Sequence, residues 1–264
     1  MFKIKIGIIG GGNMGEALIK GLHKNNALWV SEANTERTKI LKKKYHLTIA
    51  DIDTTVKQSK ILILAVKPQD MASVLEQVKT STLTGKLLIS IAAGLTTRFF
   101  ETSFDGRKIA VIRTMPNMPA LIGQGITAIC AGKYATASDI KIAQKILLTV
   151  GETVIVKESM IDAVTAVSGS GPAYVFLFVE QWMAAAKQLG FDDKQAKQLV
   201  YKTLLGSAHL LEQSKFDAST LRAKVTSKGG TTQAALNVFS SRKFDQLMKD
   251  ALSAAKKRAK ELAK

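Results

Sequence analysis

The chain has 264 residues, of which 46% are hydrophobic and 22% are charged. This length suggests one large domain or two of ordinary size, and the composition excludes a disordered chain because it supplies enough apolar side chains for a core. The single cysteine, Cys130, excludes an intramolecular disulfide and fits a reducing compartment. Cys130 lies in an apolar run that begins at Gly125, so we expect a small buried side chain.

The formal net charge is +17, from 38 Lys and Arg against 21 Asp and Glu. Such a balance can indicate a nucleic-acid-binding protein. Here the lysines are dispersed rather than clustered with aromatic residues, except at residues 42–44 and 256–258. We therefore expect no nucleic-acid partner, and interpret the charge as a general attraction for anionic ligands.

The N-terminus does not have the features of a signal peptide. Its apolar stretch is broken at once by Gly7 and the glycines at 10–12, and no small-residue cleavage site follows. No run approaches the roughly 18 apolar residues that span a bilayer. The sequence therefore predicts a soluble, cytoplasmic protein with no membrane partner.

Strand and helix patterns alternate in the first part of the chain. Apolar runs predict strands at residues 4–9, 28–31, 61–66, 87–91 and 108–113. Helical spacing of apolar residues predicts helices around residues 17–22, 40–45 and 71–78. This alternation favours βαβ units in a doubly wound parallel sheet.

After the run at 153–156, only helical patterns remain. They cover residues 163–167, 174–189, 194–212, 221–225, 231–240 and 244–262. We place a boundary near residue 158 and predict two domains: residues 1–158, an α/β domain, and residues 159–264, an all-helical domain.

The helix predicted at 174–189 is apolar on more than one side. Its apolar residues are Val175, Phe176, Phe178, Val179, Trp182 and Met183. Such a helix usually needs a partner on each side. We therefore expect a homodimer through the helical domain, which could assemble into a larger homo-oligomer; the alternative is a monomeric bundle.

A G-x-G-x-x-G motif begins at Gly10, directly after the first strand and at the start of a helix. In this context Gly10 permits the tight turn, Gly12 lets backbone approach a pyrophosphate, and Gly15 lets helix and strand pack closely. The N–H groups around Asn13 and Met14 would face the phosphates. The motif predicts a dinucleotide site in a Rossmann-like domain.

The ribose contact in such a site usually involves an acidic residue about twenty positions further on. Glu32 is in that position, and its carboxylate would accept from a 2′-hydroxyl and favour NADH. Arg37, with Ser31 and Asn34, could instead hold the 2′-phosphate of NADPH. Glu32 could also be a solvated loop residue, so the sequence leaves NADPH or NADH open.

Five further blocks occur in a fixed order behind this motif. They are Ala65-Val66-Lys67-Pro68, Ile91-Ala92-Ala93-Gly94, Arg113-Thr114-Met115-Pro116-Asn117-Met118-Pro119, Ser168-Gly169-Ser170-Gly171-Pro172-Ala173-Tyr174 and Ser227-Lys228-Gly229-Gly230-Thr231-Thr232. Together they make the chain closely resemble the pyrroline-5-carboxylate reductases over nearly its whole length. That family reduces the ring C=N of 1-pyrroline-5-carboxylate to give L-proline.

The resemblance implies roles for the blocks of the first domain. The loops Ala65, Val66, Lys67, Pro68 and Ala92, Ala93, Gly94 would hold the nicotinamide half of the cofactor, at the sheet edge where ligands bind. Lys67 could equally be a solvated lysine at a strand end. Met115 and Asn117 would line the substrate pocket, although Asn117 could instead stabilise a turn.

The resemblance places the substrate in the second domain. Ser227, Gly229, Gly230 and Thr231 would grip its carboxylate with backbone N–H groups, and Glu158 would contact the imino acid. The resemblance implies that Thr232 is the catalytic residue, whose hydroxyl would orient the ring nitrogen. Lys228 stands where the family usually has proline, and Lys224 where it often has an uncharged polar residue, which leaves the rigidity of this loop and the substrate affinity open.

No metal is expected, since alignment of substrate over the hydride donor suffices. The sequence also allows comparison with two alternative functions. A β-hydroxyacid-type dehydrogenase would need a catalytic lysine early in the first helix of the second domain, where only Lys187 occurs, near the helix end. An inactive dinucleotide-binding protein would not need the loop that ends at Thr232.

Overall fold

The structure is a computed structural model that describes residues 3–263. The chain forms two compact units. One, the sheet unit, contains Met1–Pro172 and Ala255–Lys264; the other, the helical unit, contains Ala173–Ala254. The end of the chain therefore belongs to the same unit as its beginning.

The sheet unit contains a single eight-stranded sheet in the order β3-β2-β1-β4-β5-β6-β7-β8. The strands are β1 Lys5–Ile9, β2 Ala27–Ser31, β3 Thr48–Ile49, β4 Ile61–Leu64, β5 Leu87–Ser90, β6 Ala110–Met115, β7 Gly125–Ala131 and β8 Gly151–Ile155. The predicted α/β class, a Rossmann-like parallel sheet followed by helices, is confirmed.

One strand pair departs from the parallel arrangement. β7 runs antiparallel to β6, with Arg113 opposite Cys130, whereas β7 and β8 are parallel. The connection between β6 and β7 is a short 3₁₀ turn, Met118–Ile122, rather than a crossover helix. A connection this short can only join antiparallel neighbours, since parallel neighbours need a long crossover.

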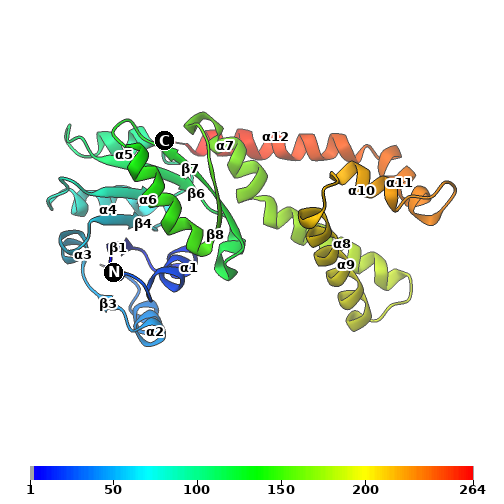
Figure 1. The fold of residues 1–264 in the computed structure, drawn as a ribbon, viewed down its shortest axis with the longest axis horizontal. Helices are drawn as coiled ribbons and strands as arrows, with labels where there is room; N and C mark the ends of the chain where they lie inside the picture. Colours follow the sequence, from blue (N-terminus) through cyan, green and yellow to red (C-terminus); the bar gives the residue numbers. More distant parts are fainter. Residues whose placement is uncertain (1–2, 264) are drawn as a thin grey trace. The chain divides into compact units, whose positions relative to one another are not determined.

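Helices cover both faces of the sheet (Figure 1). They are α1 Asn13–Leu22, α2 Thr35–Tyr45, α3 Ile52–Gln58, α4 Met71–Val78, α5 Thr97–Thr102 and α6 Ala137–Leu147. Residues of α1, α2 and α6 form one apolar cluster with β1, and residues of α3, α4 and α5 form the other with β4. This three-layer core explains why the central strands are buried on both faces.

A long helical segment leads out of the sheet unit. It runs through α7 Ile161–Val164, a π-helical turn Thr165–Gly169 and α8 Gly171–Gln188. The helix α8 begins at Gly171, with Pro172 in its first turn, where its missing N–H costs nothing. The remaining helices are α9 Asp193–Gln213, α10 Ala218–Lys224, α11 Thr231–Ser241 and α12 Phe244–Leu262.

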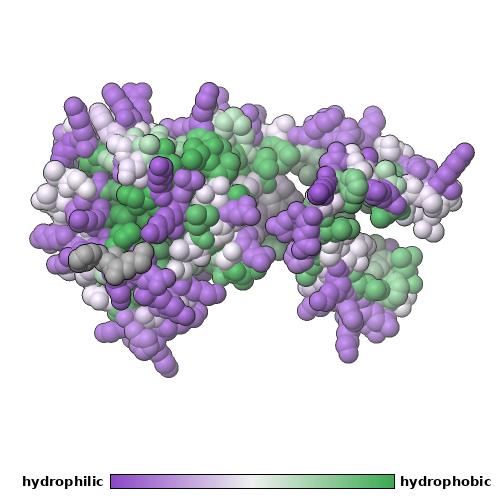
Figure 2. Space-filling view, viewed as in Figure 1, coloured by the Kyte–Doolittle hydropathy of each residue, from purple (hydrophilic) through white to green (hydrophobic). Residues whose placement is uncertain are grey.

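The segment Glu158–Gln188 is long and apolar enough to cross a membrane by length and composition, with 11% of its most apolar stretch buried. We predicted no such segment from the sequence because polar residues at helical spacing interrupt its apolar run. Among described residues, many of its large apolar side chains are exposed, Phe176 and Leu177 at 57% each. Figure 2 shows hydrophobic surface over the helical part of the chain.

Candidate functional site

The predicted cofactor residues meet at the carboxyl edge of the sheet. β1 lies between β2 and β4, with Ile9 opposite both Ser31 and Leu64. The loops that follow β1, β2 and β4 therefore begin next to one another. They lie at the point where the strand order reverses, which is where open α/β sheets bind ligands.

The glycines of the motif have the distinct environments that a dinucleotide site requires. Gly10 has a φ of +101°, and a Cβ there would lie 2.5 Å from the Ala65 carbonyl oxygen. A Cβ on Gly15 would lie 2.2 Å from the Gly10 oxygen, so helix and strand are in close contact. A Cβ on Gly12 would meet nothing within 4 Å, so this position faces open space.

The N-terminus of α1 is suited to an anion. Gly12 is its N-cap and has no side chain to bond the first-turn N–H groups, and Asn13 and Gly12 are exposed. These N–H groups and the helix dipole favour phosphate. The residues present therefore fit the pyrophosphate of a dinucleotide, with Met14 packed half-buried against the core.

Glu32 lies at the end of β2 and is tied to the glycine loop. Its carboxylate accepts hydrogen bonds from the backbone N–H of Gly11 at 2.6 Å and of Asn34 at 2.7 Å. Asn34 in turn caps α2 by accepting from the Arg37 N–H. Glu32 is therefore an ordered residue of the loop edge and not a solvated one.

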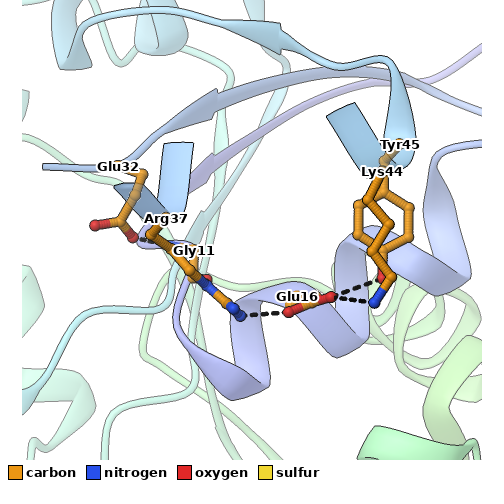
Figure 3. Close-up of polar contacts among 6 residues, drawn as sticks. All are labelled: Gly11, Glu16, Glu32, Arg37, Lys44 and Tyr45. Atoms are coloured by element: carbon orange, nitrogen blue, oxygen red, sulfur yellow. Dashed lines mark hydrogen bonds and ion pairs between the residues drawn. The ribbon is translucent and has the colours of Figure 1, made fainter. Parts of the chain in front are cut away.

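Arg37 is directed at α1 (Figure 3). Its Nε donates to the Gly11 carbonyl at 2.7 Å, and its Nη2 forms an ion pair with Glu16. Glu16 also accepts from Lys44 Nζ at 2.8 Å and from the Tyr45 hydroxyl at 2.9 Å. Burial acts to raise the pKa of Glu16, but these donors and the nearby charge of Arg37 lower that pKa overall.

The two loops assigned to the nicotinamide also lie at this edge. Ala65 and Val66 follow β4 half-buried, and Lys67 and Pro68 are exposed, with Lys67 preceding the 3₁₀ turn Pro68–Asp70. Ala92 is buried, and Ala93 is exposed beside Gly94, which has a φ of +75°. A Cβ on Gly94 would lie 2.8 Å from the Leu262 carbonyl oxygen, at the end of α12.

Met115 and Asn117 follow β6 directly. Met115 is half-buried, in a small cluster with Cys130 and Ile161. The Asn117 Oδ1 accepts from the Ile126 N–H at 2.9 Å, which ties the turn to the start of β7. Asn117 therefore has the turn-stabilising role that the sequence allowed.

Glu158 has well-defined partners in the sheet unit. Its carboxylate accepts from the Thr97 N–H and hydroxyl, both at 2.7 Å, and pairs with Arg113 Nη1 at 3.1 Å. The Arg113 side chain is 4% exposed and that of Glu158 32%. Burial acts to raise the pKa of Glu158, but the hydrogen bonds from Thr97 and Arg113 lower it overall.

Arg113 and Thr97 were not singled out from the sequence for this site. Arg113 is the one charged residue of the apolar strand β6 and is buried there, which is a signal that it is paired. Cys130, opposite Arg113, is buried as predicted, and burial raises the pKa of its thiol to about 12. A thiol with so high a pKa is not a nucleophile at neutral pH.

The loop Ser227–Gly230 precedes α11 in the helical unit. The Gly230 N–H donates to the Ser227 carbonyl at 3.0 Å, and Gly229 between them has a φ of +74°. These values define a type II turn with Lys228 at its second position. Gly230 is the N-cap of α11 and offers no side-chain cap, so the N–H groups of the first turn at Thr231 and Thr232 remain for a ligand.

Among residues 3–263, no group of three or more His, Cys, Asp and Glu side chains could hold a metal ion. The structure thus places the predicted cofactor residues together at one sheet edge, and places Ser227, Gly229, Gly230, Thr231 and Thr232 together at one helix start in the other unit.

Comparisons with known proteins identify the family. A family model for pyrroline-5-carboxylate reductase dimerisation matches residues 158–262, and one described as NADP oxidoreductase, coenzyme F420-dependent, matches residues 5–94. The chain is 39% identical to pyrroline-5-carboxylate reductase of Haemophilus influenzae, over 97% of each chain. It is 36% identical to pyrroline-5-carboxylate reductase 2 of Bacillus subtilis, over 98% of this chain and 95% of that one.

Solved structures agree with this. A pyrroline-5-carboxylate reductase from Coxiella burnetii has a TM-score of 0.92 at 34% identity, covering 100% of both chains. The Plasmodium falciparum pyrroline carboxylate reductase with NADP bound has a TM-score of 0.87 at 31% identity, also over 100% of both. The chain described here belongs to the pyrroline-5-carboxylate reductase family.

Proposed function

We propose that this chain reduces 1-pyrroline-5-carboxylate to L-proline with NADPH or NADH, the last step of proline biosynthesis. The observation that carries the proposal is the near full-length match to reductases of this name, together with a dinucleotide cradle at Gly10–Gly15 that fits a pyrophosphate. A bound nicotinamide cofactor supplies the hydride.

The cofactor-side residues bind and orient. The N–H groups at Gly12, Asn13 and Met14 hold the pyrophosphate, and Glu32, Asn34 and Arg37 form the ribose end. The small residues Ala65, Val66, Ala92, Ala93 and Gly94, with Lys67 and Pro68, form the surface for the flat nicotinamide ring.

The substrate-side residues supply an anion site and a hydroxyl. The turn at Ser227, Gly229 and Gly230 leads into the uncapped N–H groups of α11, which suit the substrate carboxylate. Thr232, in the first turn of α11, orients the ring nitrogen through its hydroxyl. The substrate nitrogen takes a proton from solvent to give the iminium, which is the better hydride acceptor. As C5 gains hydride, the C=N π electrons become the nitrogen lone pair, so a hydroxyl held at that atom orients the ring for the reaction.

Contacts of the imino acid with Glu158, Met115 and Asn117 form the rest of this proposal. The Glu158 carboxylate already accepts three hydrogen bonds from Thr97 and Arg113. A substrate contact would therefore use its remaining lone pairs, on the 32% of the side chain that is exposed.

The test is purified full-length protein mixed with 1-pyrroline-5-carboxylate and NADH or NADPH, followed by loss of cofactor absorbance and by the proline formed. Thr232→Ala should lower kcat/KM by roughly tenfold to hundredfold, the value of a hydrogen bond to a charged group. Thr232→Ser keeps the hydroxyl and should recover most of the rate. No proline with either cofactor, in protein that binds them, would refute the activity and leave an inactive dinucleotide-binding protein.

The dimer is the second part of the proposal. The family model for dimerisation covers residues 158–262, and the exposed apolar residues of α8 supply a surface for a second copy. The same model supports the boundary near residue 158 between the dinucleotide domain, 1–158, and the helical domain, 159–264. Light scattering should give at least twice the 28.5 kDa chain mass; a mass of one chain would refute the dimer.

We assign the protein to the cytoplasm, without membrane or nucleic-acid partner. The apolar segment Glu158–Gln188 is accounted for by a second copy covering α8 rather than by lipid. Fractionation of cells that express the chain tests this, since a membrane span would leave it in the pelleted membranes.

A further inference from the structure

The contacts at the end of β2 bear on which of the two nicotinamide cofactors the chain prefers. NADPH differs from NADH by a phosphate on the adenosine 2′-oxygen. In Rossmann-like domains the residue at the end of the second strand meets this position. Here that residue is Glu32, and Gly11 N–H and Asn34 N–H fix its carboxylate in place at 2.6 and 2.7 Å.

The glycine loop packs tightly against this carboxylate. A Cβ on Gly11 would lie 3.1 Å from Glu32 Oε2 and 2.4 Å from a methyl carbon of Leu41, so the loop is closely packed against both side chains. Leu41 is fully buried. Glu32 therefore presents a fixed negative charge at the ribose end, which accepts from a hydroxyl and repels a phosphate.

Arg37 is the cation that could offset the charge of Glu32, but its contacts hold it on the side of α1. Arg37 extends away from the Glu32 carboxylate toward Glu16 (Figure 3), and two of its three nitrogen atoms donate to Glu16 and to the Gly11 carbonyl. The Arg37 side chain is only 25% exposed and that of Glu16 17%. An ion pair this enclosed keeps a fixed geometry better than an exposed one.

Glu16 is itself anchored on its other side. It accepts from Lys44 and Tyr45, both at the end of α2. Glu16 therefore joins the first turn of α1 to both ends of α2 and retains Arg37 on the α1 side.

We infer that this chain prefers NADH to NADPH, with Glu32 as the specificity-determining residue and Glu16 as a positioning residue that withholds Arg37 from the 2′-phosphate. This inference rests on the proposed function for its dinucleotide site, but not on the identity of the imine. The Plasmodium falciparum relative has NADP bound, whereas the preference inferred here is argued from the contacts of Glu32, Arg37 and Glu16 in this chain.

The test is direct binding, without substrate. NADH and NADPH are titrated separately into the full-length protein by calorimetry. NADH should bind at least about tenfold more tightly, a difference of one decade being modest for like-charge repulsion. Glu32→Gln, which removes the charge but keeps an oxygen for Gly11, should narrow that difference to less than about threefold, mainly by tightening NADPH.

Glu16→Gln tests the positioning role. It should release Arg37 and tighten NADPH by about fivefold to tenfold while leaving NADH unchanged. Glu36→Gln is the matched control because it changes the net charge by the same amount. Glu36 lies on α2, but its side chain is 77% exposed and pairs with Lys39 rather than with Arg37. Adding Arg37→Gln to Glu16→Gln should return NADPH to its native affinity, and melting temperatures check that each variant is folded.

The outcomes separate the two claims. Equal or tighter binding of NADPH by the native chain overturns the preference, and a Glu16→Gln effect no larger than that of Glu36→Gln overturns the role of Glu16. Binding of neither cofactor overturns the proposed dinucleotide site itself. A preference for NADH without reduction of 1-pyrroline-5-carboxylate supports this inference and refutes the proposed reaction.

Discussion

The sheet unit and the helical unit differ in where their apolar side chains lie. All residues of β4 and β5 are buried, and the sheet carries an apolar cluster on each face. In the helical unit α8 has one buried residue, Ala186, and α11 has none. Phe176, Phe178 and Val238 of these two helices are exposed.

This contrast has a physical cause. A parallel sheet with helices on both faces buries its apolar residues within one chain. A helix that is apolar on several sides must pack against other elements on each of those sides, and a single short chain does not supply enough of them. The sheet unit thus buries its apolar side chains within one chain, whereas the helical unit leaves an apolar surface that the proposed second copy would cover.

The largest effect should come from charging that surface. Phe176→Asp combined with Phe178→Asp should dissociate the oligomer, since each side chain would lose roughly 1.5–3 kcal/mol of burial against the second copy. Light scattering and thermal unfolding measure this. Ile40→Asp, at an equally exposed apolar site on α2 of the sheet unit, should change neither the mass nor the melting temperature. An intact oligomer in the double variant would contradict the assigned interface.

Within the sheet unit, Gly15→Ala should be the more damaging of two glycine changes. Its Cβ would lie 2.2 Å from a backbone oxygen, so overpacking should lower the free energy of unfolding by about 1–3 kcal/mol. Gly12→Ala meets nothing within 4 Å, so it should lower stability less while weakening dinucleotide binding, because its methyl projects toward the pyrophosphate. Urea unfolding and cofactor titration separate the two; equal stability losses would argue against the close helix–strand contact.

Glu158 should make the sheet unit acid-sensitive. Its pKa in the folded chain is below the ordinary 4.5, so its stabilising contribution is complete above the ordinary value and is lost as pH falls through the folded pKa. Glu158→Gln should lower the free energy of unfolding at pH 7 by about 1–3 kcal/mol, because Arg113 stays buried without its charge partner.

The same variant should flatten the stability curve below pH 5, which urea unfolding at several pH values would show. Glu152→Gln, an exposed carboxylate on β8, serves as the control and should leave the curve unchanged. If Glu158→Gln left the fall in the free energy of unfolding below pH 5 unchanged, other carboxyl groups would be responsible for the pH dependence.

The smallest effect should come from Lys228→Pro in the helical unit. Lys228 occupies the second position of a type II turn, where proline is favoured, and Gly229 already supplies the positive φ that the third position needs. The change should raise stability by about 0.4–1 kcal/mol by restricting the unfolded chain. Differential scanning calorimetry measures it, with Lys224→Ala as a change outside the turn; a lower melting temperature would contradict the turn assignment.

Most of the predicted strands and helices were confirmed, and the elements that were missed include both short and longer ones. The strands β1, β4 and β5 and the helices α8, α9 and α12 lie where the apolar patterns placed them, within a few residues at their ends. The short α3 and α5 and the two-residue β3 were not predicted, since each is shorter than the window in which a period can be detected. The strand β7 and the helix α6 were not predicted either, although they have 7 and 11 residues.

The candidate site divides in the same way. The glycine motif and the acid at Glu32 could be found because their spacing follows from the geometry of one βαβ unit. The Thr97–Glu158–Arg113 cluster joins residues distant in sequence, so no local pattern could indicate it. Glu158, which the sequence alone would class as a surface acid, has three donors that only the fold brings to it.

The α/β class, a dinucleotide cradle at the glycine motif and the family could all be predicted from the sequence, because these depend on local spacing and on ordered motifs. Tertiary structure decided the antiparallel β7, the partners of Glu158 and the direction of Arg37, since each depends on which distant groups meet. The sequence left Glu32 and Arg37 as competing contacts for the ribose end. The contacts of Arg37 with Glu16 and with the Gly11 carbonyl show that this side chain is already engaged.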